Sequence, residues 1–238
     1  MTVTDALRPL TEAPERSAIF LDVDGTLAPI VERAADAAVP DDTRELLQEL
    51  ADRYALVACV SGRGAEDARR LVGLPQLTYA GAHGAELLEP GKPVRVLPAF
   101  AEWADRVHAF AAAHAVGARM EYKGPIVAYH WRGIPGLGAK LKEVADEAER
   151  QGFITHWGRK VLEIRPGVPV NKGQAVKELS KGMQTVLYAG DDVTDLDAFA
   201  VADVTVGVAS AEGPPEIRDA DIVVDGPEEF VEVLRALR

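Results

Sequence analysis

The stretch SAIFLDVDGT at residues 17–26 decides the fold. It opens with an apolar run that includes the β-branched Ile19 and turns abruptly acidic at Asp22 and Asp24. A continuous apolar run with a sharp polar end is typical of a strand that is buried on both faces, as in a parallel sheet. We therefore expect residues 17–23 to form a buried strand that ends in an acidic, glycine-containing turn.

Similar apolar runs recur outward from this stretch and alternate with helical patterns. The runs lie at residues 54–60, 76–80, 185–189, 204–208 and 222–224. The helical patterns lie at residues 42–52, 65–72, 172–179 and 194–201. Alternating strands and helices predict an α/β fold with a parallel sheet. We expect a doubly wound, Rossmann-like core.

The middle of the chain has a different pattern. Helical periodicity at residues 100–115 and 137–150 is followed each time by a pair of short alternating segments. These segments lie at residues 119–123 and 126–132, and at residues 153–157 and 160–165. The order α-β-β-α-β-β predicts a small α+β domain inserted into the core. We expect residues 1–96 and 169–238 to form the catalytic core and residues 97–168 to form an inserted cap domain.

Charge and composition exclude several classes of protein. The chain of 238 residues carries 26 Lys and Arg against 38 Asp and Glu, which gives a formal net charge of -12. This charge disfavours nucleic acid and anionic membranes as partners. Cys59 is the single cysteine, so an internal disulfide is impossible. No apolar run reaches the length of a membrane span, and the N-terminal stretch lacks the apolar core of a signal peptide.

From these features we expect a cytoplasmic enzyme with no nucleic-acid partner and no membrane partner. We also expect a monomer, although these features do not determine the oligomeric state. We interpret the N-terminal residues 1–16 as a partly ordered lead-in to the first strand.

The polar residues that follow the predicted strands are the candidates for chemistry, because ligands of open parallel sheets bind beyond the carboxyl ends of the strands. The candidates are Asp22, Asp24 and Thr26 after the first strand, Ser61–Arg63 after the second, Asp191 and Asp192 after the fourth, and Lys172 at the start of a helix. Clustered carboxylates repel one another and need a cation or a proton. Hard oxygen ligands without a Cys or His cluster favour magnesium over zinc.

The same set of residues fits phosphoryl transfer. A carboxylate can act as a nucleophile and form an aspartyl-phosphate. Transfer also needs the phosphate oxygens to be positioned and neutralised. Magnesium, Lys172 and the Ser61 hydroxyl could supply that. Taken alone, Ser61 could instead cap the following helix, and Lys172 could be a solvated surface charge.

Four motifs in a fixed order carry a resemblance to a known family. They are DVDGT at residues 22–26, SGR at 61–63, NKG at 171–173 and GDDVTD at 190–195. Together they resemble the haloacid dehalogenase-like phosphatases, whose larger cap domain is inserted between the second and third motifs. With GAHG at residues 81–84 and EYK at 121–123, the set is most similar to the trehalose-6-phosphate phosphatase family.

The resemblance implies a mechanism and a set of ligands. Asp22 would attack phosphorus, and Asp24 would protonate the leaving sugar oxygen and then activate water. The implied magnesium ligands are Asp22, the backbone carbonyl of Asp24, Asp191, and Asp192 through a water. The implied phosphate ligands are Thr26, Ser61 and Lys172, with Asp195 orienting Lys172. The implied reaction is hydrolysis of trehalose 6-phosphate to trehalose and phosphate, the last step of trehalose biosynthesis.

The insert offers a separate indication of the substrate. Because side chains alternate across a strand, one face of its sheet is apolar and the other carries charges of both signs. We expect the polar face to hydrogen-bond sugar hydroxyls. The candidate residues are Glu121, Lys123, His130, Arg132 and Glu163. The competing interpretation is a plain solvated sheet face. The roles of His83, Arg63 and Lys160 are left open.

Three other functions compete with the implied one. The first is another sugar-phosphate phosphatase of the same superfamily, and the second is a phosphomutase that uses the same aspartyl-phosphate. The third is a sugar-phosphate-binding regulator without activity, which the intact Asp22 and Asp24 disfavour.

Overall fold

The structure is a computed structural model that describes residues 2–31, 36–158, 160–211 and 213–238. The chain folds into two compact units, which are described separately. Unit 1 comprises Met1–Val94 and Asn171–Arg238, and unit 2 comprises Arg95–Val170. The sequence places the corresponding boundaries at residues 96 and 169. The assignment of the two units as catalytic core and cap stays a prediction.

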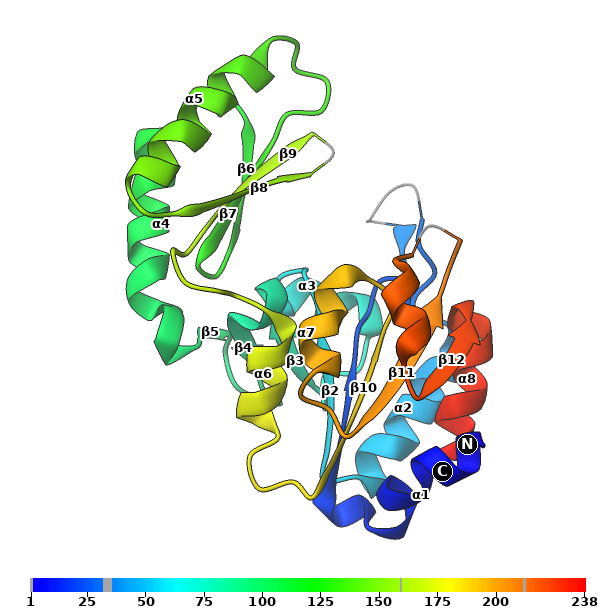
Figure 1. Ribbon diagram of the computed structural model, residues 1–238. Helices are drawn as coiled ribbons and strands as arrows, with labels where there is room; N and C mark the ends of the chain where they lie inside the picture. The colour runs from blue at the N-terminus through cyan, green and yellow to red at the C-terminus, as the bar shows by residue number, and fades with distance from the viewer. Residues whose placement is uncertain (1, 32–35, 159, 212) are drawn as a thin grey trace. The chain divides into compact units, whose positions relative to one another are not determined.

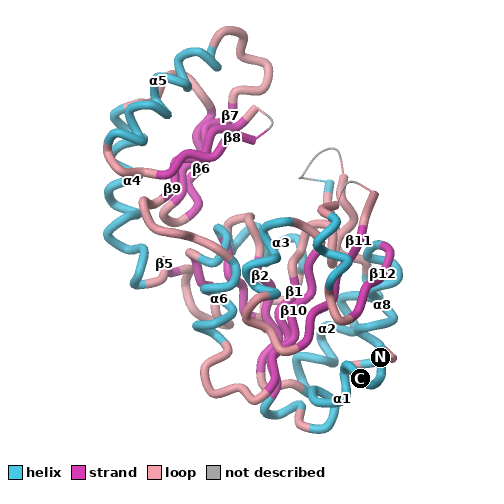
Figure 2. Tube along the Cα trace, viewed as in Figure 1, coloured by secondary structure: helices cyan, strands magenta, loops and turns pink. Residues whose placement is uncertain are grey.

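Unit 1 is built on a parallel-dominated sheet (Figures 1 and 2). Its strands are β1 (Ser17–Leu21), β2 (Leu56–Val60), β3 (Thr78–Gly81), β4 (Glu86–Leu88), β10 (Thr185–Gly190), β11 (Val204–Ala209) and β12 (Ile222–Asp225), in the order β12-β11-β10-β1-β2-β3-β4. The pairs from β12 to β3 are parallel, and β4 pairs with β3 in the antiparallel direction. The predicted α/β fold with a parallel sheet is therefore confirmed.

Helices cover both faces of this sheet. They are α1 (Val3–Glu12), α2 (Asp41–Arg53), α3 (Ala65–Val72), α6 (Lys172–Leu179), α7 (Leu196–Phe199) and α8 (Gly226–Ala236). The short 3-10 helices are η1 (Pro14–Arg16), η3 (Ala82–Gly84), η5 (Val193–Asp195) and η6 (Pro215–Asp219). Alternate residues of β1 point to opposite faces: Ile19 packs with α1, α2, α3 and α8, whereas Phe20 packs with α6 and α7. Burial on both faces explains why β1 is a continuous apolar run.

The expectation of a partly ordered N-terminal lead-in is wrong. Residues 3–12 form α1, which begins where the Asp5 backbone N–H donates to the Thr2 hydroxyl oxygen at 3.1 Å. Ala6, Leu7 and Leu10 are buried in the core of unit 1. Three apolar residues at helical spacing are enough to dock one helix face, although Pro9 lies inside the helix and weakens its pattern.

Unit 2 has a four-stranded antiparallel sheet with two helices on one face. Its elements are β5 (Arg95–Val96), η4 (Pro98–Phe100), α4 (Ala101–Ala113), β6 (Arg119–Lys123), β7 (Ile126–His130), α5 (Leu137–Arg150), β8 (Ile154–Gly158) and β9 (Val161–Arg165), and the order of the sheet is β6-β7-β9-β8. Tyr129 and Leu162 lie on the buried face and pack against Phe110 of α4 and Leu141 of α5. This is the apolar face that strand alternation predicts.

None of the described helices combines the length and the apolar character that crossing a membrane requires.

Candidate active site

The carboxyl ends of β1, β2 and β10 meet at one edge of the sheet of unit 1. Leu21, the last residue of β1, pairs with Ala189 of β10 on one side and with Cys59 of β2 on the other. The order of the strands reverses at β1, with β2 and β3 on one side and β10, β11 and β12 on the other. The edge beyond β1 is therefore a topological switch point, where open α/β sheets bind ligands. The register places Asp22 beside the ends of both neighbouring strands. Ser61 and Asp191 follow those strands directly.

Three buried carboxylates gather at this edge. Asp22, Asp191 and Asp195 each offer an oxygen, and these oxygens lie within 4.8 Å of one another. Lys172, the first residue of α6, is also buried, with a relative exposure of 3%. Its Nζ donates to Asp22 Oδ1 at 2.6 Å and to Asp195 Oδ1 at 2.7 Å. A lysine that the sequence alone could have placed in solvent is thus an internal partner of two carboxylates.

Asp195 supports the cluster. Its Oδ1 accepts from Lys172 and from the Tyr188 hydroxyl at 2.6 Å. Its Oδ2 accepts from the backbone N–H groups of Asp191 at 3.1 Å and Asp192 at 3.0 Å. Four donors therefore occupy its two oxygens, which fixes both the lysine and the acidic loop. Sequence reasoning missed Tyr188, because a tyrosine inside an apolar strand looks like an ordinary core residue.

Burial sets the electrostatics of these groups. Desolvation raises the pKa of Asp22 well above its ordinary value, and the neighbouring carboxylates raise it further against the opposing charge of Lys172. Desolvation and the charge of Asp195 likewise raise the pKa of Asp191 to about 7. The pKa of Lys172 is raised, because the charges of Asp22 and Asp195 outweigh its desolvation. One lysine does not balance three buried carboxylates.

The donor set fits a hard divalent cation. Asp191 Oδ1 is buried and has no hydrogen-bond partner among the described residues. The clustered ligand atoms are carboxylate oxygens, which magnesium prefers to nitrogen or sulfur. Ionising Asp22, Asp191 and Asp195 beside Lys172 leaves an excess of two negative charges, which such a cation balances.

Two hydroxyl groups lie where the sequence predicts phosphate ligands. Ser61 is buried, and its Oγ accepts from the Arg63 backbone N–H at 3.1 Å, which leaves the hydroxyl hydrogen available to a ligand. The Thr26 hydroxyl is buried and has no hydrogen-bond partner in the described parts of the chain. A buried hydroxyl without a partner is costly, so a ligand that accepts from it is a physical reason for its presence.

Asp24 is engaged at the rim by a residue whose role the sequence left open. Both Asp24 oxygens accept from the Arg63 guanidinium, at 2.7 Å from Nε and 2.5 Å from Nη2. The Asp24 side chain is 40% exposed, so water reaches it. Asp192 lies outside the group of three carboxylates, because it is exposed and its side chain accepts from the Asp195 backbone N–H in a capping box.

The predicted sugar-binding residues all lie in unit 2, and the structure joins four of them in pairs. Glu121 and Glu163 flank Ala128 in the strand register, so they share one face of the sheet. Glu121 Oε2 lies 2.7 Å from His130 Nε2, and Glu163 Oε1 accepts from Lys123 at 3.3 Å. Arg165 Nη2 donates to the other Glu163 oxygen at 2.5 Å. Arg132 is exposed beyond the end of β7, and the Lys160 ammonium lies 4.2 Å from the Trp131 ring centroid.

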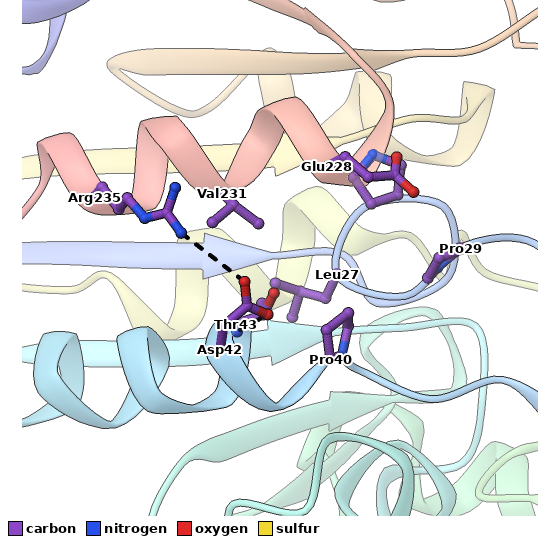
Figure 3. A pocket seen from close by; sticks show the side chains of 9 residues that line it. Leu27, Pro29, Pro40, Asp42, Thr43, Glu228, Val231 and Arg235 are labelled. Carbon is purple, nitrogen blue, oxygen red and sulfur yellow. Dashed lines mark hydrogen bonds and ion pairs between the residues drawn. The ribbon is translucent and has the colours of Figure 1, made fainter.

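A separate hollow of about 370 Å³ lies elsewhere in unit 1 (Figure 3). It is lined by α2, α8 and the loop after β1, and the Arg235 guanidinium lies 3.9 Å from the Asp42 carboxylate across it. None of the predicted site residues lines this hollow. The convergent carboxylates and the buried lysine make the strand ends the candidate site instead.

Substituting Gly190 by alanine tests the packing behind the carboxylates. A Cβ atom at Gly190 would lie 2.3 Å from Asp195 Cγ, so the carboxylate must move and loosen Lys172. We expect a loss of about 1–3 kcal/mol in the free energy of unfolding, together with weaker binding of a divalent cation at the carboxylates. Thermal melts and magnesium titrations would measure the two effects. Gly64→Ala is the control, because its Cβ finds ordinary space; an equal effect of the two variants would contradict the interpretation.

The chain is similar to a known protein family, to individual relatives and to solved structures. A model of the trehalose-phosphatase family matches residues 20–218. Probable trehalose-phosphate phosphatase 2 of Oryza sativa subsp. japonica is 32% identical over 263 aligned residues, covering 94% of this chain and 68% of the rice protein. An uncharacterized glycosyl hydrolase of Mycobacterium tuberculosis is 34% identical over 87% of this chain, which spans 17% of that relative's length. The crystal structure of a trehalose-6-phosphate phosphatase related protein has 27% identity and a TM-score of 0.68, covering 92% of this chain and 95% of that one.

Proposed function

Because the chain belongs to the trehalose-phosphatase family, we propose that it hydrolyses trehalose 6-phosphate to trehalose and phosphate, the last step of trehalose biosynthesis. The observation that carries this proposal is the buried Asp22 carboxylate at the switch point of the sheet, bound to Lys172 and close to Asp191. We further propose that the enzyme acts as a cytoplasmic monomer.

In the proposed reaction Asp22 is the nucleophile. One of its oxygens forms a bond to phosphorus while the bond from phosphorus to the sugar oxygen breaks, and the Asp24 carboxyl gives its proton to that leaving oxygen. A water molecule then attacks the phospho-aspartate and gives a proton to Asp24. Inorganic phosphate leaves, and Asp22 and Asp24 return to their starting states. In this proposal Lys172 and the hydroxyl groups of Ser61 and Thr26 hold the phosphate oxygens.

We propose that Asp22, the backbone carbonyl of Asp24 and Asp191 hold Mg²⁺, with Asp192 behind a bound water. Bound there, Mg²⁺ supplies positive charge that neutralises the phosphate oxygens. The buried Asp191 oxygen without a hydrogen-bond partner supports this assignment.

We propose that the polar face of the unit 2 sheet recognises the sugar. Carboxylates such as Glu121 and Glu163 accept hydrogen bonds from hydroxyl groups, whereas Lys123 and Arg132 donate. The ion pair between Lys123 and Glu163 is nearly buried, with side chains 14% and 10% exposed, which is unusual for a plain solvated face. That burial favours a built recognition surface.

Phosphate release from a panel of sugar phosphates, with Mg²⁺ and with EDTA, tests the proposal. We expect strong preference for trehalose 6-phosphate and loss of release in EDTA. A preference for another sugar phosphate would be compatible with the Asp22 chemistry and would reject trehalose 6-phosphate as the substrate. Isomer formation without phosphate release would identify a phosphomutase, and no release from any compound would reject the phosphatase assignment.

The raised carboxyl pKa values predict how pH controls metal binding. Between about pH 4 and pH 7 the folded chain keeps a proton on Asp191 that the unfolded carboxyl has already lost, so the contribution of this group to stability falls as pH rises. The raised pKa of Asp22 acts in the same direction. Mg²⁺ competes with these protons. We therefore expect Mg²⁺ to raise Tm more at about pH 8 than at about pH 5, by roughly 2–4 °C for each kcal/mol of extra binding free energy.

Differential scanning fluorimetry at both pH values would measure this difference. The control is Asp191→Asn, which removes a proposed ligand and should abolish most of the Mg²⁺-dependent shift. An equal shift at both pH values would contradict the assignment of these carboxylates as ligands.

A further inference from the structure

The turn at Gly81–Gly84, which directly follows β3, has an unusual backbone. Ala82 has a φ of 51° and His83 a φ of 56°, and they are followed by Gly84 at 97°. Non-glycine residues with positive φ are uncommon and cost free energy, and in the described chain the other one is Lys160. Such conformations persist where the surroundings enforce them, and they cluster at functional sites.

Hydrogen bonds lock this turn to the serine loop, which we define as Ser61–Arg63. The Ala82 backbone N–H donates to the Arg63 carbonyl oxygen at 2.7 Å, and the His83 N–H donates to the Ser61 carbonyl oxygen at 2.9 Å. The Ser61 N–H donates in turn to the Ala80 carbonyl oxygen at 2.9 Å. The serine loop is therefore held by backbone bonds at both of its ends.

The imidazole ring of His83 fills the space beside the middle of the serine loop. A Cβ atom built on Gly62 would lie 2.8 Å from His83 Cε1 and 3.1 Å from His83 Nε2. No side chain fits between ring and backbone, so the ring limits how far Gly62 can move toward it. The glycine at position 62 and the histidine at position 83 are thus a matched pair.

The far end of the turn abuts the helix that carries Lys172. A Cβ atom on Gly84 would lie 2.7 Å from Ala175 Cβ and 3.1 Å from the Asn171 carbonyl oxygen. The turn is therefore wedged between the serine loop and the start of α6. Those two segments carry Ser61 and Lys172, which are two of the three proposed phosphate ligands.

We propose that the Gly81–Gly84 turn is a brace that sets the spacing of the phosphate ligands, and that His83 is a positioning residue that holds the serine loop. The proposal rests on the proposed phosphatase function. The Ser61 Oγ already accepts from the Arg63 N–H, so its hydrogen stays available to a ligand as long as the loop keeps this geometry. Loss of the ring lets the loop relax and misplaces that donor.

The test compares four variants of the full chain with the wild type, using inorganic phosphate as the probe in the presence of Mg²⁺. His83→Asn removes the ring but keeps a residue that tolerates positive φ. Gly62→Ala pushes on the ring from the other side, and the double variant combines both changes. Gly64→Ala is the matched glycine-to-alanine control outside the serine loop and the turn, because its Cβ finds ordinary space. Calorimetry gives the Kd of phosphate, melts give Tm, and steady-state assays give kcat and KM.

We expect His83→Asn to raise both the Kd of phosphate and the KM by roughly threefold to tenfold, the size typical of coupling between residues in contact. Its Tm should be nearly unchanged. Gly62→Ala should weaken phosphate binding more, and the double variant should bind phosphate better than Gly62→Ala does. Gly64→Ala should keep the wild-type Kd, and its Tm should be equal or higher.

Two results separate the failure of this proposal from the failure of the proposed function. Wild-type phosphate affinity in His83→Asn, together with a double variant no better than Gly62→Ala, would overturn the brace alone. Failure of the wild type to bind phosphate with Mg²⁺ would overturn the phosphatase assignment and the brace with it.

Discussion

Asp22→Asn should lower phosphate release by about 10⁴- to 10⁶-fold, the loss typical of removing a nucleophile. The amide that replaces the carboxylate cannot attack phosphorus. The substitution keeps the shape of the side chain, so the packing at the end of β1 is preserved. Steady-state assays at saturating Mg²⁺ would measure the loss.

Stability separates this loss of chemistry from misfolding. Burial raises the pKa of Asp22, which means that its ionised form is unfavourable inside the protein. Without Mg²⁺ we therefore expect Asp22→Asn to melt at or above the wild-type temperature. The matched control is Asp52→Asn, which removes the same charge from an exposed position on α2 and should keep full activity. Retained turnover in Asp22→Asn would reject the assignment of Asp22 as the nucleophile.

Asp24→Asn should lower turnover of a sugar phosphate by about 10²- to 10⁴-fold, which is the usual contribution of a general acid and base. The effect depends on the leaving group. An aryl phosphate has a leaving group that needs no proton, so the first half of the reaction should survive. The second half still needs Asp24 to accept a proton from water.

Rapid mixing of Asp24→Asn with p-nitrophenyl phosphate would expose this difference. We expect a burst of nitrophenol equal to one per protein chain, followed by slow release. Because Arg63 binds both Asp24 oxygens, Arg63→Lys provides a comparison that alters the partner and leaves the carboxylate. A slow release without a burst would place Asp24 elsewhere in the reaction.

The parallel core was predictable because burial leaves a direct trace in sequence. Strands covered on both faces are apolar along most of their length, as at residues 18–21, and the polar residue that follows marks the strand end. The strand register then determines which residues are neighbours. Leu21 pairs with both neighbouring strands, so Asp22 must lie near the residues that follow them. The sequence pattern alone was therefore enough to predict that the carboxylates gather at one edge of the sheet.

Other features leave no such trace. The Arg63–Asp24 ion pair joins residues that are 39 positions apart, and its geometry depends on side-chain rotamers. The hydrogen bond from Tyr188 to Asp195 is hidden because the ring alone would suit the core. The positive φ of Ala82 arises from the hydrogen bonds around it, since alanine has no preference for that region. These are tertiary effects that override local propensity.

The most direct test of the central claim is peptide mass spectrometry of the Asp24→Asn variant, quenched in acid after reaction with p-nitrophenyl phosphate and Mg²⁺. We predict that the peptide containing Asp22 gains the mass of one phosphoryl group. The same peptide of an Asp22→Asn, Asp24→Asn double variant should remain unmodified. A burst of nitrophenol with an unmodified Asp22, or with the phosphoryl group on another residue, would contradict the account.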